Sequence, residues 1–123
     1  MSTINVTGLQ VISVFCSDLE NSKNFYIDHL GFNNPQDMPP GILLYSGELT
    51  LYLEPGRQSR NPELLKFPEI SPCFACDSVK EAYENLKNAG ISIVSDYVEY
   101  EEQFAMFKIA DPDGNLIELA GNP

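Results

Sequence analysis

The chain has 123 residues, 43% of them hydrophobic, and carries 18 acidic against 7 basic side chains, a net charge of −11. This length and composition predict one ordered domain with a single core, covering residues 1–123. A strongly negative surface repels phosphate backbones, which argues against nucleic acid as a partner. No apolar run approaches the roughly 20 residues that span a bilayer, and the first residues, MSTINVTG, form no export signal. We therefore expect a cytoplasmic protein that makes no membrane contact.

The first elements of the chain are a strand and an amphipathic helix. Residues 9–16, LQVISVFC, are rich in β-branched and aromatic residues, which predicts a buried strand. Ser17 or Asp18 caps the helix that follows, and apolar residues at helical spacing continue it to about Leu30. The Pro-rich segment 33–41 predicts turns.

Two further strands complete the first half, and the same pattern then begins again. Residues 42–46 and 49–54 predict strands on either side of a Gly-Glu turn. After a Pro-rich connector, residues 71–76 predict a strand, and residues 79–89 predict a second helix, capped by Asp77. The distance along the chain from the capping Asp to the terminating Gly is thirteen residues in both helices, from Asp18 to Gly31 and from Asp77 to Gly90. This spacing indicates an internal repeat of β-α-β-β-β units.

The second unit ends with a hairpin, FKIADPDGNLIELAG, over residues 107–121. A strand, ISIVSDYV, and an acidic loop at residues 99–103 precede it. Pro112 presets φ for a turn and Gly114 tolerates the positive φ that re-enters a strand. Alternation along the returning strand places Glu118 on the face opposite its apolar neighbours. Glu118 is therefore a candidate site residue.

Two segments carry a resemblance to a known family: VISVFCSDLENSKNFYIDHLGF near the start and FKIADPDGNLIEL near the end. With these motifs the chain resembles the vicinal-oxygen-chelate superfamily of glyoxalase I, bleomycin resistance proteins and extradiol dioxygenases. The resemblance implies an α+β fold of two βαβββ modules, which form an open, barrel-like curled mixed sheet with the helices outside. The modules would cover about 7–55 and 71–121, joined by a linker of about 56–70. It also implies a homodimer, sometimes with exchanged strands.

Enzymes of this superfamily hold a divalent metal with two side chains from each module, mainly His, Glu and Gln. The four positions fall here on Val11, Thr50, Ser71 and Glu118, of which only Glu118 is a usual ligand. Transition-metal sites need three or four positioned N, O or S donors, and a carboxylate with two hydroxyls does not supply them. We therefore predict no cofactor. A divalent metal in a displaced site with Glu48 or Glu54 is the alternative.

Other residues that could take part in chemistry are better explained by structural roles. His29, the only histidine, lies at the end of the first helix, where it is expected to be a solvent-facing cap. Cys73 and Cys76 lie three apart on a strand and point to opposite faces, which prevents them from converging on a metal. Together with Cys16 they are expected to be free thiols.

Glu118 itself allows three interpretations. In the first, Glu118 is a relic of the metal site whose carboxylate is satisfied by hydroxyls or by Lys108. In the second it is an acid that binds a ligand, and in the third it is a general base in a metal-free enzyme. The acidic stretch 96–102 is either a solvated turn or, with its two tyrosines, a surface that attracts a cationic ligand.

The function expected from the sequence is that of a metal-free, small-molecule-binding protein of the bleomycin-resistance type. The alternatives are a glyoxalase-like lyase or isomerase with a displaced metal site, and an interacting subunit whose cavity is filled. The expected ligand cavity is lined by nine residues: Val11, Ser13, Thr50, Tyr52, Ser71, Cys73, Met106, Lys108 and Glu118.

Overall fold

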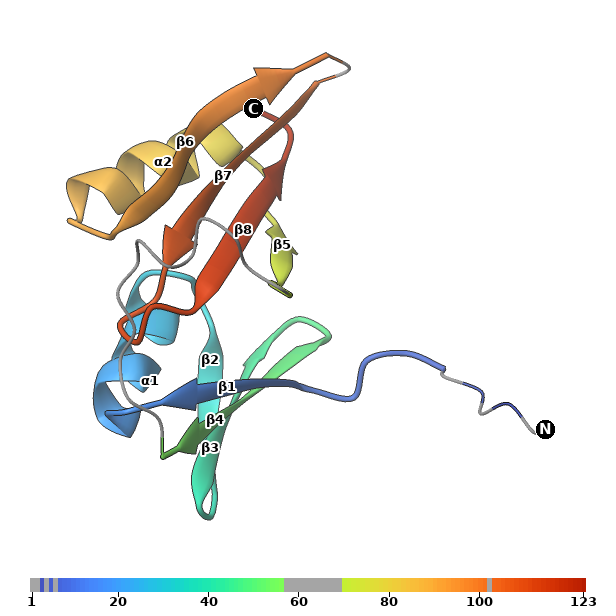
Figure 1. The fold of residues 1–123 in the computed structure, drawn as a ribbon, viewed down its shortest axis with the longest axis vertical. Coiled ribbons are helices and arrows are strands. Elements are labelled where there is room, and N and C mark those ends of the chain that lie inside the picture. Colours follow the sequence, from blue (N-terminus) through green and yellow to red (C-terminus); the bar gives the residue numbers. More distant parts are fainter. Residues whose placement is uncertain (1–2, 4, 6, 57–69, 102) are drawn as a thin grey trace.

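The structure is a computed structural model that describes residues 3, 5, 7–56, 70–101 and 103–123. These residues form two four-stranded sheets, each packed against one helix (Figure 1). The first module consists of β1 (Ile12–Cys16), α1 (Leu19–Asp28), β2 (Asn33–Met38), β3 (Gly41–Ser46) and β4 (Leu49–Pro55). The second consists of β5 (Cys73–Ala75), α2 (Val79–Asn88), β6 (Ile93–Tyr100), β7 (Phe104–Ala110) and β8 (Leu116–Gly121).

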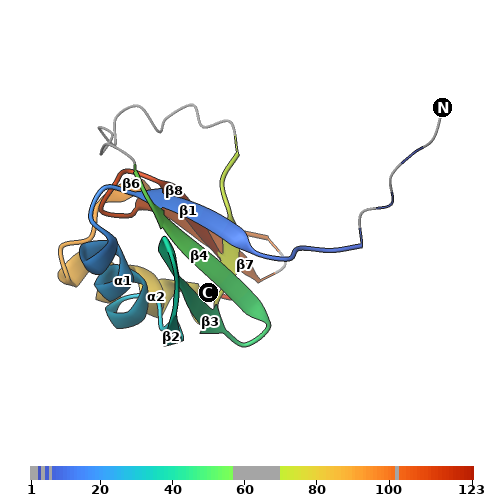
Figure 2. The same ribbon diagram turned by 90° about the horizontal axis from the view of Figure 1, so that it is seen from below.

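The two modules repeat one topology, as the sequence predicts. The sheet orders are β1-β4-β3-β2 and β5-β8-β7-β6, with the first strand of each module parallel to its last. The sheets are mixed and do not close into a barrel, and both helices lie on the same side of the molecule (Figure 2). The linker expected at 56–70 lies almost entirely outside the described residues.

The helix caps confirm one prediction and correct another. The Asp18 carboxylate accepts a hydrogen bond from the Asn21 backbone N–H at 3.0 Å, which begins α1. In α2 the cap is Ser78 and not Asp77, because the Ser78 hydroxyl accepts from the Glu81 N–H at 3.4 Å. An N-cap side chain must reach the N–H three residues later, and this geometry selects Ser78.

One segment expected as turns is a strand, and the beginning of an expected loop belongs to another strand. Residues 33–38 form β2, at the edge of the first sheet, with a register irregularity between Asn33 and Gln36. An edge strand tolerates Pro35 because one side of its backbone needs no sheet partner. Of the acidic loop expected at residues 99–103, Glu99 and Tyr100 instead end β6, which pairs with β7 as far as Tyr100. Charged residues are compatible with this edge strand since its side chains are largely exposed.

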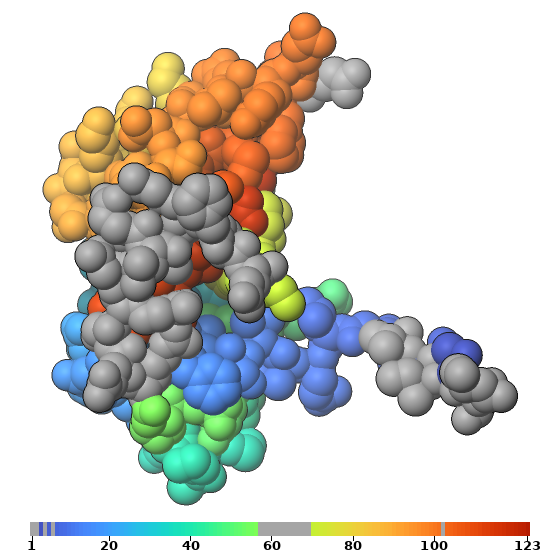
Figure 3. All heavy atoms as spheres, viewed as in Figure 1, coloured from blue at the N-terminus to red at the C-terminus, as the bar shows by residue number. Residues whose placement is uncertain are grey.

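One hydrophobic core joins the modules. Its buried side chains come from both sheets and both helices. Phe32, which follows α1, packs edge-on against Phe74 of β5, with ring centroids 5.7 Å apart. Figure 3 shows the two modules as adjoining lobes of the space-filling surface. No helix among the described residues is long and apolar enough to cross a membrane.

A polar contact between modules lies where the β7–β8 turn reaches α1 (Figure 1). Asp113 of this turn is 1% exposed. Its carboxylate accepts hydrogen bonds from the Ser17 N–H at 2.9 Å and from the Ser22 hydroxyl at 3.3 Å. Nearby, the Tyr26 hydroxyl donates to Oδ2 of Asp111 at 2.8 Å. We call these five residues the inter-module clasp.

Asp111 also organises its own turn. Its Oδ1 accepts from the backbone N–H groups of Asp113 and Asn115, and its Oδ2 accepts from the Asn115 amide. Burial raises the pKa of Asp111, while the hydrogen bonds from Asn115 and Tyr26 oppose that rise. Burial and the nearby Asp111 charge raise the pKa of Tyr26 well above its usual value, so its hydroxyl remains a donor.

Replacing Tyr26 with Phe tests the clasp. The variant loses one hydrogen bond to ionised Asp111 and is expected to unfold with about 1–2 kcal/mol less free energy at neutral pH. Without the Tyr26 donor the folded-state pKa of Asp111 rises further. The deficit is therefore full above that pKa and shrinks as acid protonates Asp111 in both proteins.

Urea unfolding between pH 4 and 8 measures this deficit. Tyr45→Phe is the matched control, because the Tyr45 hydroxyl makes no hydrogen bond within the described residues. A deficit for Tyr26→Phe that stays constant across this pH range would show that the hydroxyl does not stabilise the ionised carboxylate.

Candidate functional site

Glu118 occupies the central part of the second sheet, on the face that α2 does not cover. Its neighbours Ile117 and Leu119 are buried in the core, so alternation directs Glu118 to the opposite face. Lys108 on β7 and Cys73 on β5 are its cross-strand partners. We call this surface the helix-free face of the second sheet.

Both carboxylate oxygens of Glu118 have partners. The Ser71 hydroxyl donates to Oε2 at 2.8 Å, and Nζ of Lys108 lies 3.9 Å from Oε1. The Glu118 side chain is 22% exposed. A backbone hydrogen bond from the Glu118 N–H to the Pro72 carbonyl, 2.9 Å, extends the β5 pairing and holds Ser71 beside the carboxylate. Glu118 is therefore a satisfied, half-buried acid.

This arrangement matches the interpretation in which hydroxyls and Lys108 satisfy Glu118. Ser71 and Glu118 are two of the four residues to which the resemblance assigns the metal-ligand positions, and they lie within hydrogen-bonding distance. Lys108 contributes a positive charge to the same face. The set can hold a polar ligand group by hydrogen bonding and charge, and it offers one carboxylate as a metal donor.

The other predicted cavity residues divide between the sheets. Met106 lies two residues before Lys108 on the same face of β7. In the first sheet, Ser13 is the register partner of Tyr52. Val11 and Thr50 come directly before Ile12 and Leu51, which are also register partners. Within the described residues, no hydrogen bond or ion pair joins the two groups. A single cavity lined by all nine residues stays a prediction.

An aromatic patch lies at the far end of the same face; sequence reasoning named Tyr100 together with Tyr97, but missed Phe104. Tyr100 and Phe104 are register partners at the end of the β6–β7 hairpin, with ring centroids 6.0 Å apart. Val98 is the partner of Met106, and Tyr100 is 53% exposed. A signal for this patch was present in the sequence. Val98 and Tyr100 are two residues apart, as are Phe104 and Met106, and when the two strands pair, all four side chains lie on one face.

The donor set does not fit the metal centre of the superfamily. No group of three or more His, Cys, Asp or Glu side chains able to hold a metal ion occurs among residues 7–56, 70–101 and 103–123. A divalent transition metal takes three or four positioned donors, and Ser71 and Lys108 are not such donors at neutral pH. The displaced site with Glu48 or Glu54 is likewise not assembled by the described residues.

Burial raises the pKa of the thiols in this region. All three cysteines are free. Burial, and secondly the Glu118 charge, raise the pKa of Cys73, and burial raises that of Cys76. Cys73 is exposed while Cys76 packs against the core, which confirms that they face apart. A raised pKa lowers the thiolate fraction, so neither is an activated nucleophile. His29 caps the C-terminal end of α1 and is exposed, as predicted.

Comparison with known proteins identifies the family. Residues 8–119 match the model of the Glyoxalase/Bleomycin resistance protein/Dioxygenase superfamily, and the chain belongs to this superfamily.

Three proteins similar to this chain are compared with it. The uncharacterized protein YetH of Bacillus subtilis (strain 168) is 26% identical, covering 93% of this chain and 98% of YetH. Glyoxylase I 4 of Arabidopsis thaliana is 30% identical, and the match covers 94% of this chain and 71% of that protein. The crystal structure of FosX, a fosfomycin resistance protein of Listeria monocytogenes, superposes with a TM-score of 0.77 at 17% identity, covering 97% and 96%. The FosX likeness establishes the shared fold.

Two substitutions rank the partners of Glu118. Ser71→Ala removes a 2.8 Å hydrogen bond to a charged group and is expected to lower the free energy of unfolding by about 1–2 kcal/mol. Lys108→Met removes a longer, partly exposed ion pair and is expected to cost less than about 1 kcal/mol. Urea unfolding at neutral pH measures both, and a larger loss for Lys108→Met would reverse the assignment.

Proposed function

We propose that the protein is a metal-free, small-molecule-binding member of the superfamily that takes its ligand on the helix-free face around Glu118. The observation that carries this proposal is the state of the Glu118 carboxylate. Ser71 and Lys108 engage its two oxygens, where an enzyme of the superfamily would place metal donors. The scaffold is thus kept while its metal chemistry is replaced by a hydrogen bond and an ion pair.

The ligand that fits this face is cationic and carries an aromatic ring. The rings of Tyr100 and Phe104 are exposed and offer π faces to a cation or a second ring. The net charge of −11 attracts cations to the protein over a distance set by the salt concentration. We also propose a homodimer, as is common in proteins that resemble this one.

A metal-dependent lyase or isomerase is the competing function. Its support is the 30% identity to a protein named Glyoxylase I 4. The lyase requires further metal donors near Glu118, and Glu48 or Glu54 are the candidates. Glu54 lies on β4 and shares a face with Tyr52.

Metal analysis separates the two functions. The protein is purified without chelators, and Ni, Zn, Fe and Mn are quantified in the wild type and in Glu118→Gln. We expect well under one metal per chain and no difference between the two proteins. One metal per chain in the wild type, lost in Glu118→Gln, would establish the metal-dependent alternative.

Ligand binding is tested with bleomycin, a cationic probe with aromatic rings. We expect saturable shifts of the amide signals of Glu118, Tyr100 and Phe104 in ¹H–¹⁵N spectra. Truncating both rings, Tyr100→Ala with Phe104→Ala, is expected to weaken binding at least fivefold, whereas Tyr45→Phe leaves it unchanged. Shifts confined to other surfaces, or equal binding by the truncated protein, would contradict the placement of the ligand.

A further inference from the structure

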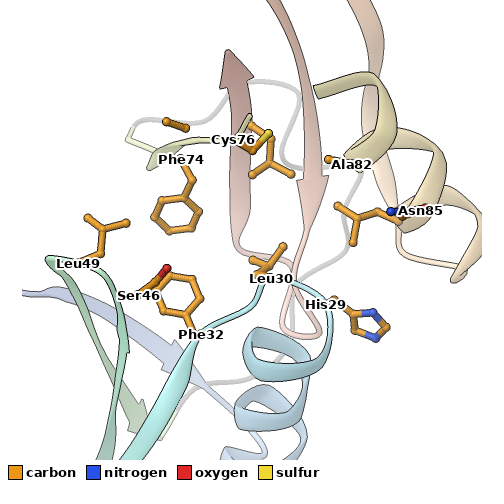
Figure 4. Close-up of a pocket in the computed structure, with 12 residues that line it drawn as sticks. His29, Leu30, Phe32, Ser46, Leu49, Phe74, Cys76, Ala82 and Asn85 are labelled. Atoms are coloured by element: carbon orange, nitrogen blue, oxygen red, sulfur yellow. The ribbon is translucent and has the colours of Figure 1, made fainter. Parts of the chain in front are cut away.

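A cavity lies between the modules, away from the helix-free face. Its volume is about 290 Å³ (Figure 4). The end of α1 and the β3–β4 turn form its wall on one side, and β5, α2 and β8 form the other. It is therefore built from both modules, and pockets at such junctions are frequent ligand sites.

This cavity and the Glu118 site lie on opposite faces of one strand. Leu119 of β8 lines the cavity, while Glu118, the residue before it, points to the helix-free face. Phe74 and Leu86 line the cavity as well and belong to the core side of the second sheet. A molecule bound here would contact none of the groups that engage Glu118.

The walls of the cavity favour an uncharged, aromatic guest. Among the described residues that line it there is no Asp, Glu, Lys or Arg, and burial raises the pKa of its Cys76 thiol, which favours the neutral form. Phe32 and Phe74, which already pack edge-on, present ring surface to the interior. Apolar and aromatic walls favour a flat, apolar molecule, and offset or edge-on ring contacts add to its binding.

A small number of polar groups lie at the cavity margin. Figure 4 shows His29 and Asn85 on the same side of the cavity, across from Leu49. Within the part of the chain that the structure describes, the His29, Ser46 and Asn85 side chains make no hydrogen bond. A guest with one donor or acceptor can pair with them without displacing an existing bond.

We propose that this inter-module cavity binds neutral aromatic molecules of one or two rings that carry a single hydrogen-bonding group, such as phenols and indoles. The size agrees, because a dry cavity of about 150 Å³ holds benzene and this one is larger. A guest here contacts both modules at once, so binding also stabilises their relative placement.

The test titrates the full chain with indole, and separately with 4-methylphenol, by ¹H–¹⁵N spectroscopy. We expect saturable shifts of the Leu86 and Leu119 amides and a rise in melting temperature. Ala82→Leu fills the cavity from α2 and is expected to weaken indole at least tenfold. Lys80→Leu adds the same side chain to an exposed position of α2 outside the cavity and is expected to bind indole as the wild type does.

Two further variants make the outcome decisive. Ser46→Leu fills the cavity from the opposite wall, in case Ala82→Leu loses its dispersed spectrum, and is expected to weaken indole similarly. Glu118→Gln is expected to leave indole binding unchanged. Absence of saturable binding, binding that survives both filling variants, or shifts centred on Glu118 and Tyr100 would each overturn the proposal.

Discussion

The burial of two carboxylates between the modules is the constraint on which the rest of the structure depends. Asp111 and Asp113 are 5% and 1% exposed, and burying ionisable groups without partners is strongly unfavourable. Asp113 accepts from the Ser17 N–H and the Ser22 hydroxyl at the positive, N-terminal end of α1, and Asp111 accepts from the Tyr26 hydroxyl near the other end of the helix. These partners exist in only one relative placement of the modules. That placement positions the Phe32–Phe74 contact and, with it, the cavity between the sheets.

The sequence predicts the fold well where a local signal and the tertiary environment agree. The final hairpin, the α1 cap and the βαβββ repeat follow from turn residues, hydrophobic spacing and the family motifs. The errors lie at the sheet edges. β2 carries Pro35, and β6 continues through Glu99 and Tyr100 into the expected acidic loop. In both cases one partner strand supplies hydrogen bonds that residue preference cannot reveal. The Ser78 cap was missed by one residue, within the usual uncertainty of helix ends.

The site was predictable to the extent that it depends on alternation along strands. That pattern places Lys108 and Glu118 on one face, and the hairpin register then makes them partners. The hydrogen bond from Ser71 depends on where β5 begins, and the sequence does not specify this. The pairing of Tyr100 with Phe104 was hidden because residues 99–103 were expected to be a loop, whereas Tyr100 ends β6 and pairs with β7. The inter-module cavity draws on segments far apart in the chain, whose packing no sequence pattern encodes.

The clasp also sets an order for biosynthesis. Its hydrogen bonds join residues 85, 91 and 96 positions apart. A chain emerging from the ribosome can therefore form the strands and helix of the first module long before the turn at Asp111 and Asp113 is available to α1. Until then, Tyr26 and Ser22 lack the acceptors that they have in the finished protein. Long-range contacts of this kind form late and slow folding. A nascent chain stalled before residue 111 thus exposes the surface of α1 that the second module covers, and this surface is where a chaperone would be needed.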